Sequence, residues 1–293
     1  MHIFVTGATG WVGKSVVDDL LAHGHHVVGL SRSEEKGKVL RAKGVEVVYA
    51  TLDDLDALRN AVKTADAVIH LAFDHDFSRM AENAAQDKRA IEAMGEALLG
   101  TDKLLLVTSG MAMISPGRPV TETDVPPAGP APRQSEESVR ALAAKGVRAA
   151  SVRLAGSVHG VGDTNGLISR LIDVARRTAV SAYIGEGKNR WAGVHVSDAG
   201  PVYRLALETG VTELVYHAVD EEGVTLRDLA EVIGRKYGLP VESRGADHFG
   251  EFAMFAGVDM PALSAQTREV LNWHPTGPDL LSDLAKPDYY PGN

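Results

Sequence analysis

Short apolar runs alternate with runs of helical period through the first half of the chain. The predicted strands are His2–Thr6, His26–Leu30, Val45–Tyr49, Ala67–Leu71, Lys103–Thr108 and Val147–Arg153, and the predicted helices are Gly13–Ala22, Lys36–Lys43, Asp54–Val62, Ser78–Leu98 and Ser135–Lys145. Strand–helix alternation of this kind predicts a parallel sheet with helices on both faces. The strands are rich in Val, Leu and Ile without strict polar alternation, as in sheets covered on both faces. The pattern therefore predicts an α/β fold with a doubly wound parallel sheet.

The second half of the chain has a weaker pattern. It contains predicted helices at Leu167–Arg177, Ser197–Glu208 and Leu226–Tyr237 and a late strand at Leu214–Val219. Six prolines between residues 115 and 132 predict a loop there. We expect residues 1–155 and 191–239 to form the domain that contains the sheet, and residues 156–190 and 240–293 to form a smaller lobe.

The composition limits the classes of function. Apolar residues make up 44% of the chain, and the formal net charge is −9, which argues against a nucleic-acid surface because such surfaces are basic. The chain contains no cysteine, so disulfides, zinc–thiolate sites and thiol nucleophiles are excluded. The sequence begins directly with a strand-like run, and no apolar run reaches the length of a membrane span. We therefore expect a soluble, cytoplasmic protein.

Three glycines, Gly7, Gly10 and Gly13, follow the first predicted strand and open the first predicted helix. In that context one glycine permits a tight turn, one lets the backbone approach a pyrophosphate, and one lets the helix pack on the strand. The amino terminus of the helix then attracts the anion. The alternative, a simple strand-to-helix turn, does not require three spaced glycines. The loop predicts a nucleotide-binding site.

The spacing of the loop, TGATGWVG, resembles the nucleotide loop of the extended and atypical short-chain dehydrogenases/reductases. Six further segments resemble motifs of that superfamily in the same order: VEVVYATLDDLDAL, DAVIHLAF, LLLVTSG, VRLAGSVHG, NRWAGVHVSDAG and LSAQTREVLNWHP. The resemblance covers the whole chain. It implies a Rossmann fold that binds a nicotinamide dinucleotide, followed by a small carboxyl-terminal lobe that binds the substrate.

The second strand ends in GLSRSEEK, which bears on the choice of cofactor. NAD sites usually place an Asp or Glu here to bind the ribose 2′-hydroxyl, whereas this chain has Ser31 and Arg32. A carboxylate would repel a 2′-phosphate, and a guanidinium binds one in a fork geometry. We therefore predict NADP(H) rather than NAD(H); the alternative is that Arg32 is an ordinary surface residue. By resemblance, the cofactor would also contact Thr9, Trp11, Val12, Thr51, Leu52, Leu71, Ala72, Phe73, Thr108 and Arg153.

A catalytic pair that the superfamily uses is missing from this chain. The superfamily combines Tyr-x-x-x-Lys with a serine: the tyrosine exchanges a proton with the substrate oxygen, and the lysine lowers the tyrosine pKa and binds the nicotinamide ribose. By resemblance the tyrosine would fall between Ala128 and Pro132, and the lysine between Pro132 and Glu136. The chain reads AGPAPRQSE there, and it contains no Tyr-x-x-x-Lys at any position.

Other residues are then candidates for the chemistry. Ser109 matches the superfamily serine, although a serine that ends a buried strand can also simply bond its own backbone. His159 stands where the motif VYG has its tyrosine. The remaining candidate proton donors are His75, Tyr183 and Ser135, together with water and the substrate itself.

Apolar residues near the predicted site suggest a substrate pocket. Met111, Met113, Trp191 and Phe249 are candidates for its wall, and core packing is the alternative for each. No histidine cluster has zinc-type spacing, so we predict no metal. No GxSxG motif of a hydrolase is present.

The sequence therefore predicts an atypical NADPH-dependent reductase of an apolar ketone, aldehyde, imine or activated alkene. Two alternatives remain: a regulator that binds NADP(H) without turnover, and an epimerase or isomerase that uses the nicotinamide transiently. By analogy with the superfamily, a homodimer would form through the helices predicted at Ser78–Leu98 and Ser135–Lys145.

Overall fold

A seven-stranded parallel sheet forms the centre of the larger domain. The computed structural model describes residues 1–111, 114, 117–126 and 133–290 of the chain. The strands of the sheet are β1 (His2–Thr6), β2 (His26–Ser31), β3 (Glu46–Tyr49), β4 (Ala67–His70), β5 (Leu104–Gly110), β6 (Arg148–Leu154) and β10 (Val215–Ala218), in the order β10-β6-β5-β4-β1-β2-β3. All neighbouring pairs are parallel. The prediction of a doubly wound α/β fold is confirmed.

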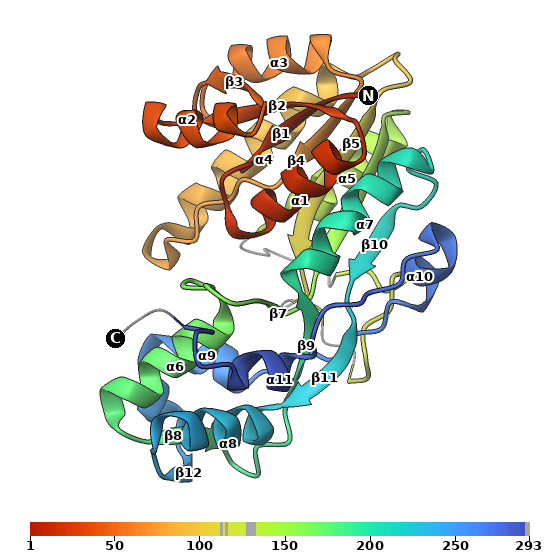
Figure 1. Ribbon diagram of the computed structural model, residues 1–293. Helices are drawn as coiled ribbons and strands as arrows, with labels where there is room; N and C mark the ends of the chain where they lie inside the picture. The colour runs from red at the N-terminus through yellow and green to blue at the C-terminus, as the bar shows by residue number, and fades with distance from the viewer. Residues whose placement is uncertain (112–113, 115–116, 127–132, 291–293) are drawn as a thin grey trace.

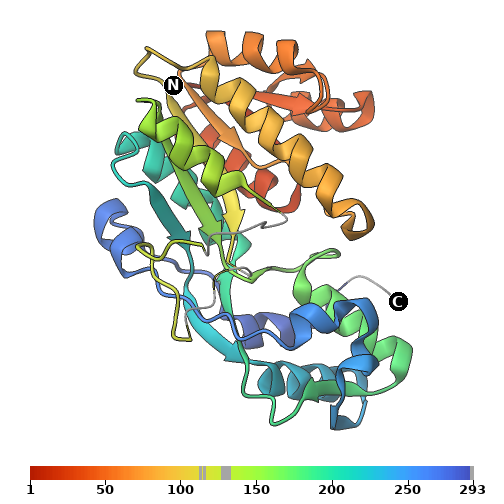
Figure 2. The same ribbon diagram turned by 180° about the vertical axis from the view of Figure 1, so that it is seen from behind.

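Helices cover both faces of this sheet (Figures 1 and 2). One face carries α1 (Trp11–Ala22), α2 (Glu34–Ala42) and α7 (Val196–Glu208), and the other carries α3 (Leu55–Thr64), the short η1 (Phe77–Arg79), α4 (Met80–Glu96) and α5 (Ser135–Ala144). Each helix packs through an apolar stripe; in α3 the stripe is Leu58, Ala61 and Val62. The strand order reverses between β1 and β4, and ligands of such sheets bind at the carboxyl ends of the strands beside this reversal.

A smaller lobe with its own core lies beyond the carboxyl ends of the central strands (Figures 1 and 2). It contains α6 (Leu167–Thr178), β8 (Ser181–Ile184), α8 (Leu226–Tyr237), β12 (Val241–Arg244), η2 (Ala246–Phe252), α9 (Ala253–Ala256) and α11 (Leu280–Ala285). A three-stranded sheet of β7 (Ser157–His159), β9 (Arg190–His195) and β11 (Glu221–Thr225) lies between this lobe and the larger domain. The remaining helix, α10 (Ala265–Leu271), packs near β10 and α7.

The boundary between the two cores differs from the one that we expected. The apolar face of α8, including Leu229 and Ile233, is buried in the smaller lobe, although we expected that helix in the larger domain. Conversely, Leu271 and Trp273 are buried in the core of the larger domain. The sequence shows that a helix has an apolar face, but not which neighbour covers it. Among the helices that the structure describes, none is long and apolar enough to cross a membrane.

Candidate functional site

The turn between β1 and α1 requires glycine at two of its three glycine positions. Gly7 has a φ of 71°, and a Cβ on it would lie 2.7 Å from the amide nitrogen of Ala72. A Cβ on Gly13 would lie 2.0 Å from the carbonyl oxygen of Gly7. Both obstacles are backbone atoms, so no side chain fits at either position. These glycines let the chain turn directly from the sheet into α1.

Gly10 has a different role in the same turn. It is the exposed residue before α1, with a φ of −72° and a ψ of 176°, a conformation open to any residue. A Cβ there would lie 3.1 Å from the carbonyl oxygen of Gly7. No described side chain caps this end of α1. Open N–H groups at a helix amino terminus attract anions, so the geometry of this loop fits a pyrophosphate.

Trp11 joins the glycine loop to the strand that leads into the smaller lobe. Its Nε1 donates to the carbonyl oxygen of Val158 at 2.8 Å, and a Cβ on Gly160 would lie 2.9 Å from its ring. Trp11 and Val12 are partly buried. The polar atom of the indole is therefore used within the protein, where it holds α1 against β7.

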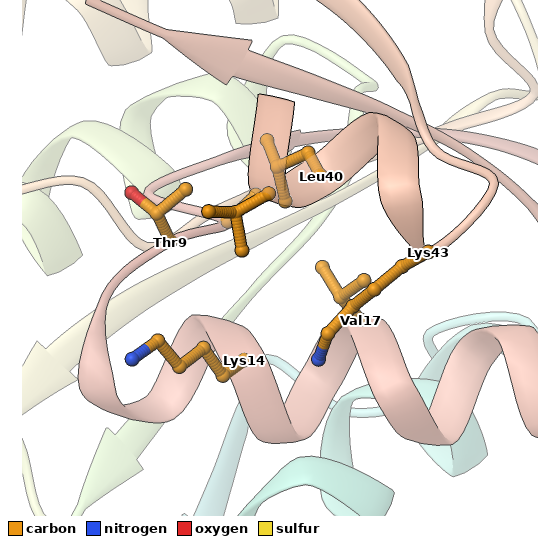
Figure 3. A pocket seen from close by; sticks show the side chains of 7 residues that line it. Thr9, Lys14, Val17, Leu40 and Lys43 are labelled. Carbon is orange, nitrogen blue, oxygen red and sulfur yellow. The ribbon is translucent and has the colours of Figure 1, made fainter. Parts of the chain in front are cut away.

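A cavity of about 40 Å³ lies behind the glycine loop, between α1 and α2 (Figure 3). Its walls are Ala8, Thr9, Lys14, Val17, Val39, Leu40 and Lys43. Thr9 and Lys14 lie on one side of the cavity and Lys43 on the other (Figure 3). Lys43 forms an ion pair with Asp18. Lys14 is exposed and places a positive charge close to the loop.

The ends of β2 and β3 carry the residues that we expected beside the adenosine. Ser31 is buried, and its hydroxyl donates to the carbonyl oxygen of Ser33 at 2.9 Å. Arg32 is exposed, and its side chain has no hydrogen-bond or ion-pair partner among the described residues. The Thr51 hydroxyl donates to Asp54 at 2.8 Å, and Leu52 is buried. Of these residues, Arg32 is the one with a charged group available to a ligand.

The chain that leaves β4 runs past the glycine loop. The amide nitrogens of Leu71 and Ala72 both donate to the Thr6 hydroxyl at 3.2 Å. Phe73 follows, partly buried, with the guanidinium of Arg133 4.0 Å above its ring. The segment that we expected to line the dinucleotide is therefore fixed to the end of β1.

A buried hydrogen-bond chain continues from Thr6 to the helices behind the sheet. Thr6 Oγ1 lies 2.7 Å from His70 Nδ1, and His70 Nε2 lies 3.1 Å from the Asp87 carboxylate. The Ser135 hydroxyl donates to the other Asp87 oxygen at 2.5 Å. All four side chains are buried. The chain joins β1, β4, α4 and the start of α5 below the edge where the glycine loop lies.

The Asp87 side chain is ionised in this hydrogen-bond network. Burial alone would raise its pKa, but the His70 hydrogen bond and the charge of Arg133 outweigh burial, and the pKa lies below the usual value. The sequence did not single out His70 or Asp87: the segment DAVIHLAF contains His70 but indicates no role for its side chain, and Asp87 stands in no quoted motif. The one available signal was an acidic residue on the apolar face of an amphipathic helix.

The end of β5 carries Ser109, the expected catalytic serine. Its hydroxyl is buried and has no hydrogen-bond partner among the described residues. The neighbouring Thr108 hydroxyl lies 2.8 Å from the phenol oxygen of Tyr203 on α7. Burial raises the pKa of Tyr203, and its phenol lies on the α7 face of the sheet, so it does not replace the missing tyrosine as proton donor.

Arg133 lies beside this strand end, within the range where the superfamily lysine was expected. Its Nη2 donates to the carbonyl oxygen of Thr108 at 2.9 Å, and its Nε donates to the Ser135 hydroxyl at 2.7 Å. His75 packs edge-on against Phe73 with ring centroids 5.2 Å apart. Burial and the charge of Arg133 lower the pKa of His75, so its imidazole is neutral at neutral pH.

The structure places His159 at the joint between the two parts of the molecule. It is fully buried, with Nδ1 2.9 Å from Asp283 on α11 and Nε2 3.4 Å from Glu221 on β11. Burial lowers its pKa, but the hydrogen bond with Asp283 and the negative charges of Asp283 and Glu221 outweigh burial, and the net shift is upward. His159 therefore stabilises the packing of α11 against β7 and β11.

Tyr183 lies apart from the other catalytic candidates. It belongs to β8, at the far end of the smaller lobe from the sheet (Figure 1). Its phenol accepts a hydrogen bond from Arg227 at 2.7 Å, and the Arg227 guanidinium lies over its ring. The structure does not bring Tyr183 together with Ser109.

Arg153 has an environment that differs from the expected cofactor contact. Its side chain is fully buried, and it donates to both carboxylate oxygens of Glu136 at 2.8 and 2.7 Å. It also donates to the carbonyl oxygens of Thr121 and Asp124. The guanidinium thus joins β6, the start of α5 and the loop after β5. Sequence spacing shows that an arginine ends a strand, but not which carboxylate folds over it.

The expected pocket residues are mainly in the two cores. Met111 is buried in the core of the larger domain, and Trp191 and Phe249 are buried in the core of the smaller lobe. Their full burial favours packing, the alternative that we gave for each. Met113 lies outside the described residues. Within the described ranges, no three His, Cys, Asp or Glu side chains are arranged to hold a metal ion.

Comparisons with other proteins show which sequences and folds this chain is similar to. The chain is 45% identical to an uncharacterized protein of Schizosaccharomyces pombe over 99% of its length and 100% of that protein. It is 30% identical to the 2′-dehydrokanamycin reductase of Streptomyces kanamyceticus, over 82% of this chain and 68% of that one. A solved UDP-glucose-4-epimerase from Stenotrophomonas maltophila with bound NAD shares its fold with a TM-score of 0.77, at 18% identity, over 99% and 97% of the two chains.

A family model matches residues 3–219, which run from β1 through β10 and include the glycine loop, the end of β5 and Arg153. The match spans most of the chain and agrees with the resemblance that the sequence motifs indicate. The protein belongs to the NAD dependent epimerase/dehydratase family.

Proposed function

We propose that this protein is an NADP(H)-dependent reductase of an apolar ketone, aldehyde, imine or activated alkene. One observation carries the proposal: the buried Ser109 hydroxyl at the end of β5 has no partner among the described residues, and the Arg133 guanidinium is bound to the carbonyl oxygen of the preceding Thr108. Both groups lie at the sheet edge that also holds the glycine loop. The relative that reduces 2′-dehydrokanamycin supports a reductase over other activities of the family.

The residues at this edge fit a nicotinamide dinucleotide. Gly10 and the open end of α1 would hold the pyrophosphate, and Arg32 the adenosine phosphate. Leu71, Ala72 and Phe73 would line the path toward the nicotinamide. When bound, the reduced nicotinamide would supply hydride to the substrate. The protein's own contribution is to orient both molecules and to stabilise charge at the substrate.

The first experiment is NADPH oxidation with a panel of apolar ketones, aldehydes, imines and enones, with NADPH and NADH binding measured directly alongside. We expect turnover of one class at a rate above that of protein-free buffer. Tight NADPH binding without turnover of any class would contradict the reductase proposal. It would favour a regulator that binds NADP(H) without turnover. The absence of the Tyr-x-x-x-Lys pair is compatible with that function.

The choice of NADP(H) rests on Arg32 and is tested by Arg32→Ala. Because Arg32 has no described partner, its loss leaves the fold intact and removes only the phosphate contact. A charge-assisted hydrogen bond contributes about 1.5–3 kcal/mol, so we expect NADPH affinity to fall about ten- to a hundredfold. NADH affinity should change by less than about twofold, since NADH has no 2′-phosphate. Fluorescence titration of both cofactors measures the difference.

Arg235→Ala is the control, because Arg235 is an exposed arginine on α8 in the smaller lobe. It removes the same charge at a distance from the glycine loop and should leave both affinities unchanged. Equal losses of NADPH and NADH affinity in Arg32→Ala would rule out the 2′-phosphate assignment.

A further inference from the structure

Arg133 is held in one orientation by four contacts on its inner side. Its Nε donates to Ser135 at 2.7 Å, and its Nη2 donates to the Thr108 carbonyl oxygen at 2.9 Å and lies 3.5 Å from Asp87. The guanidinium carbon lies over the Phe73 ring, 4.0 Å from its centroid. The side chain is 22% exposed, so it is neither a free surface arginine nor a sealed core one.

The supports of Arg133 are themselves fixed. Ser135 is bonded to Asp87, Asp87 to His70, and His70 to Thr6 at the end of β1. The guanidinium is therefore positioned from the sheet, through side chains that are at most 1% exposed. Arg has five N–H donors, and the contacts above use those on Nε and Nη2. Nη1 has no hydrogen-bond partner among the residues that the structure describes.

Ser109 and Arg133 lie on the same face of β5. The Thr108 side chain points to α7, where it contacts Tyr203. Successive side chains of a strand point to opposite faces, so Ser109 points to the α4 and α5 side, from which Arg133 reaches the Thr108 carbonyl oxygen. A buried hydroxyl without a partner costs free energy unless a ligand pairs with it. Two groups that can donate therefore lie on this face: the Ser109 hydroxyl, which has no partner among the described residues, and the fixed Arg133 guanidinium.

We propose that Arg133 and Ser109 together bind the carbonyl oxygen of the substrate and make the site selective for neutral carbonyl compounds over protonated imines. This rests on the proposed reductase function. Bound NADPH would supply hydride to the carbonyl carbon, the π electron pair of the C=O bond would move to oxygen, and water would supply the proton that completes the alcohol. Arg133 stabilises the negative oxygen but does not supply the proton, because a guanidinium remains charged at any pH the protein tolerates.

The positive charge of Arg133 should also discriminate between carbonyl compounds and iminium ions as substrates. A ketone or aldehyde becomes an alkoxide and an enone becomes an enolate, and the fixed cation stabilises both as negative charge develops. An iminium ion is already positive, and the cation repels it. The structure therefore narrows the four proposed classes to compounds in which an oxygen gains negative charge.

The test compares wild type with Arg133→Met, Arg133→Lys and the surface control Arg59→Met. Methionine keeps an apolar stem on Phe73, and lysine keeps the charge without the fork. We expect kcat/KM for a ketone or enone to fall about 10²- to 10³-fold in Arg133→Met, with Arg133→Lys recovering at least tenfold. The ratio of imine to ketone kcat/KM should rise at least tenfold in Arg133→Met. The NADPH Kd should stay close to wild type in all variants. The Tm should fall in Arg133→Met, which removes a charge beside the buried Asp87, but each variant should keep a cooperative unfolding transition.

A binding measurement separates this inference from the function on which it rests. Cyclohexanecarboxylate presents an anionic oxygen on an apolar ring and can be titrated by calorimetry into the complex with NADP⁺. We expect it to bind wild type at least tenfold more tightly than Arg133→Met, whether or not any panel compound is turned over. Equal binding, or a loss of NADPH affinity that matches the loss of kcat/KM, would overturn the inference, because Arg133 would then serve the cofactor or only the fold.

Discussion

Replacing Gly13 by alanine is expected to unfold the larger domain, whereas replacing Gly10 by leucine is expected to abolish cofactor binding in a folded protein. The added Cβ at Gly13 would lie 2.0 Å from the Gly7 carbonyl oxygen, and neither backbone segment can yield without moving α1 from the sheet. Losses above about 4 kcal/mol arise from clashes of this kind. We expect Gly13→Ala to lose its cooperative thermal transition by circular dichroism, or to show it at a much lower temperature.

A substitution at Gly10, in the same loop, is expected to leave the protein folded but to remove cofactor binding. It has an ordinary φ, its Cβ would meet one atom at 3.1 Å, and a leucine would point into the exposed space before α1. That space is where we propose that the pyrophosphate binds. Gly10→Leu should therefore keep a Tm near wild type and lose NADPH binding by at least a hundredfold in fluorescence titration.

Gly245→Leu is the matched control for Gly10→Leu. Gly245 has nearly the same backbone conformation, with a φ of −71° and a ψ of 167°, and open space around its Cβ, but it lies in the smaller lobe. It should change neither Tm nor affinity. NADPH binding retained by Gly10→Leu would remove the phosphate-loop assignment, and a stable Gly13→Ala would show that the turn is more adaptable than its geometry indicates.

Replacing Glu136 by glutamine is expected to lower the free energy of unfolding by about 3–5 kcal/mol, the cost of breaking a buried ion pair at one partner. Glutamine has nearly the same shape but leaves the buried Arg153 guanidinium without its countercharge. Urea unfolding measures the loss. Cofactor affinity should remain near wild type, because Arg153 is occupied within the protein.

The pH dependence gives this prediction a second readout. Burial raises the pKa of Glu136, but the hydrogen bonds and charge of Arg153 outweigh burial and hold it below its usual value. The pair therefore stabilises the fold above the unfolded-state pKa of about 4.3, and this contribution is lost as the pH falls through the lower folded-state pKa. The acid limb of the stability profile should be flatter in Glu136→Gln.

Glu137→Gln is the control for the second prediction. Glu137 is the next residue of α5 and is exposed, so removing its charge should cost less than about 0.5 kcal/mol. An equal effect of the two substitutions would show that the buried pair contributes little. A loss of NADPH affinity in folded Glu136→Gln would restore the cofactor role that the sequence suggested for Arg153.

The glycine loop could be predicted from the sequence because its requirements are local. The turn from β1 into α1 is specified by residues within one short segment, and the close approaches at Gly7 and Gly13 follow from that turn. The order of strands and helices could likewise be predicted, because apolar residues recur within each element at the spacing typical of a strand or a helix. The place of Arg32 directly after β2 was predictable for the same reason, and its contact with a 2′-phosphate stays a prediction.

The surroundings of Ser109 could not be predicted in this way. Thr6, His70, Asp87 and Ser135 come from four separate elements, and no motif indicates that their side chains are bonded to one another. Arg133 stood in the segment where a lysine was expected, but its stacking on Phe73 depends on the crossover from β4 through α4 and β5. Hydrogen bonds between distant segments carry no sequence period and leave no local signal.

By itself, the sequence determined the doubly wound sheet, the phosphate-type loop and the absence of the Tyr-x-x-x-Lys pair, because each is a property of contiguous residues. Only the tertiary structure decided that Arg153 pairs with Glu136, that Tyr183 lies far from Ser109, and that α8 packs in the smaller lobe. The physical reason is that charged side chains and apolar helix faces contact residues that are distant in the sequence. The sequence is compatible with several such pairings, and the packing of the folded chain decides which one forms.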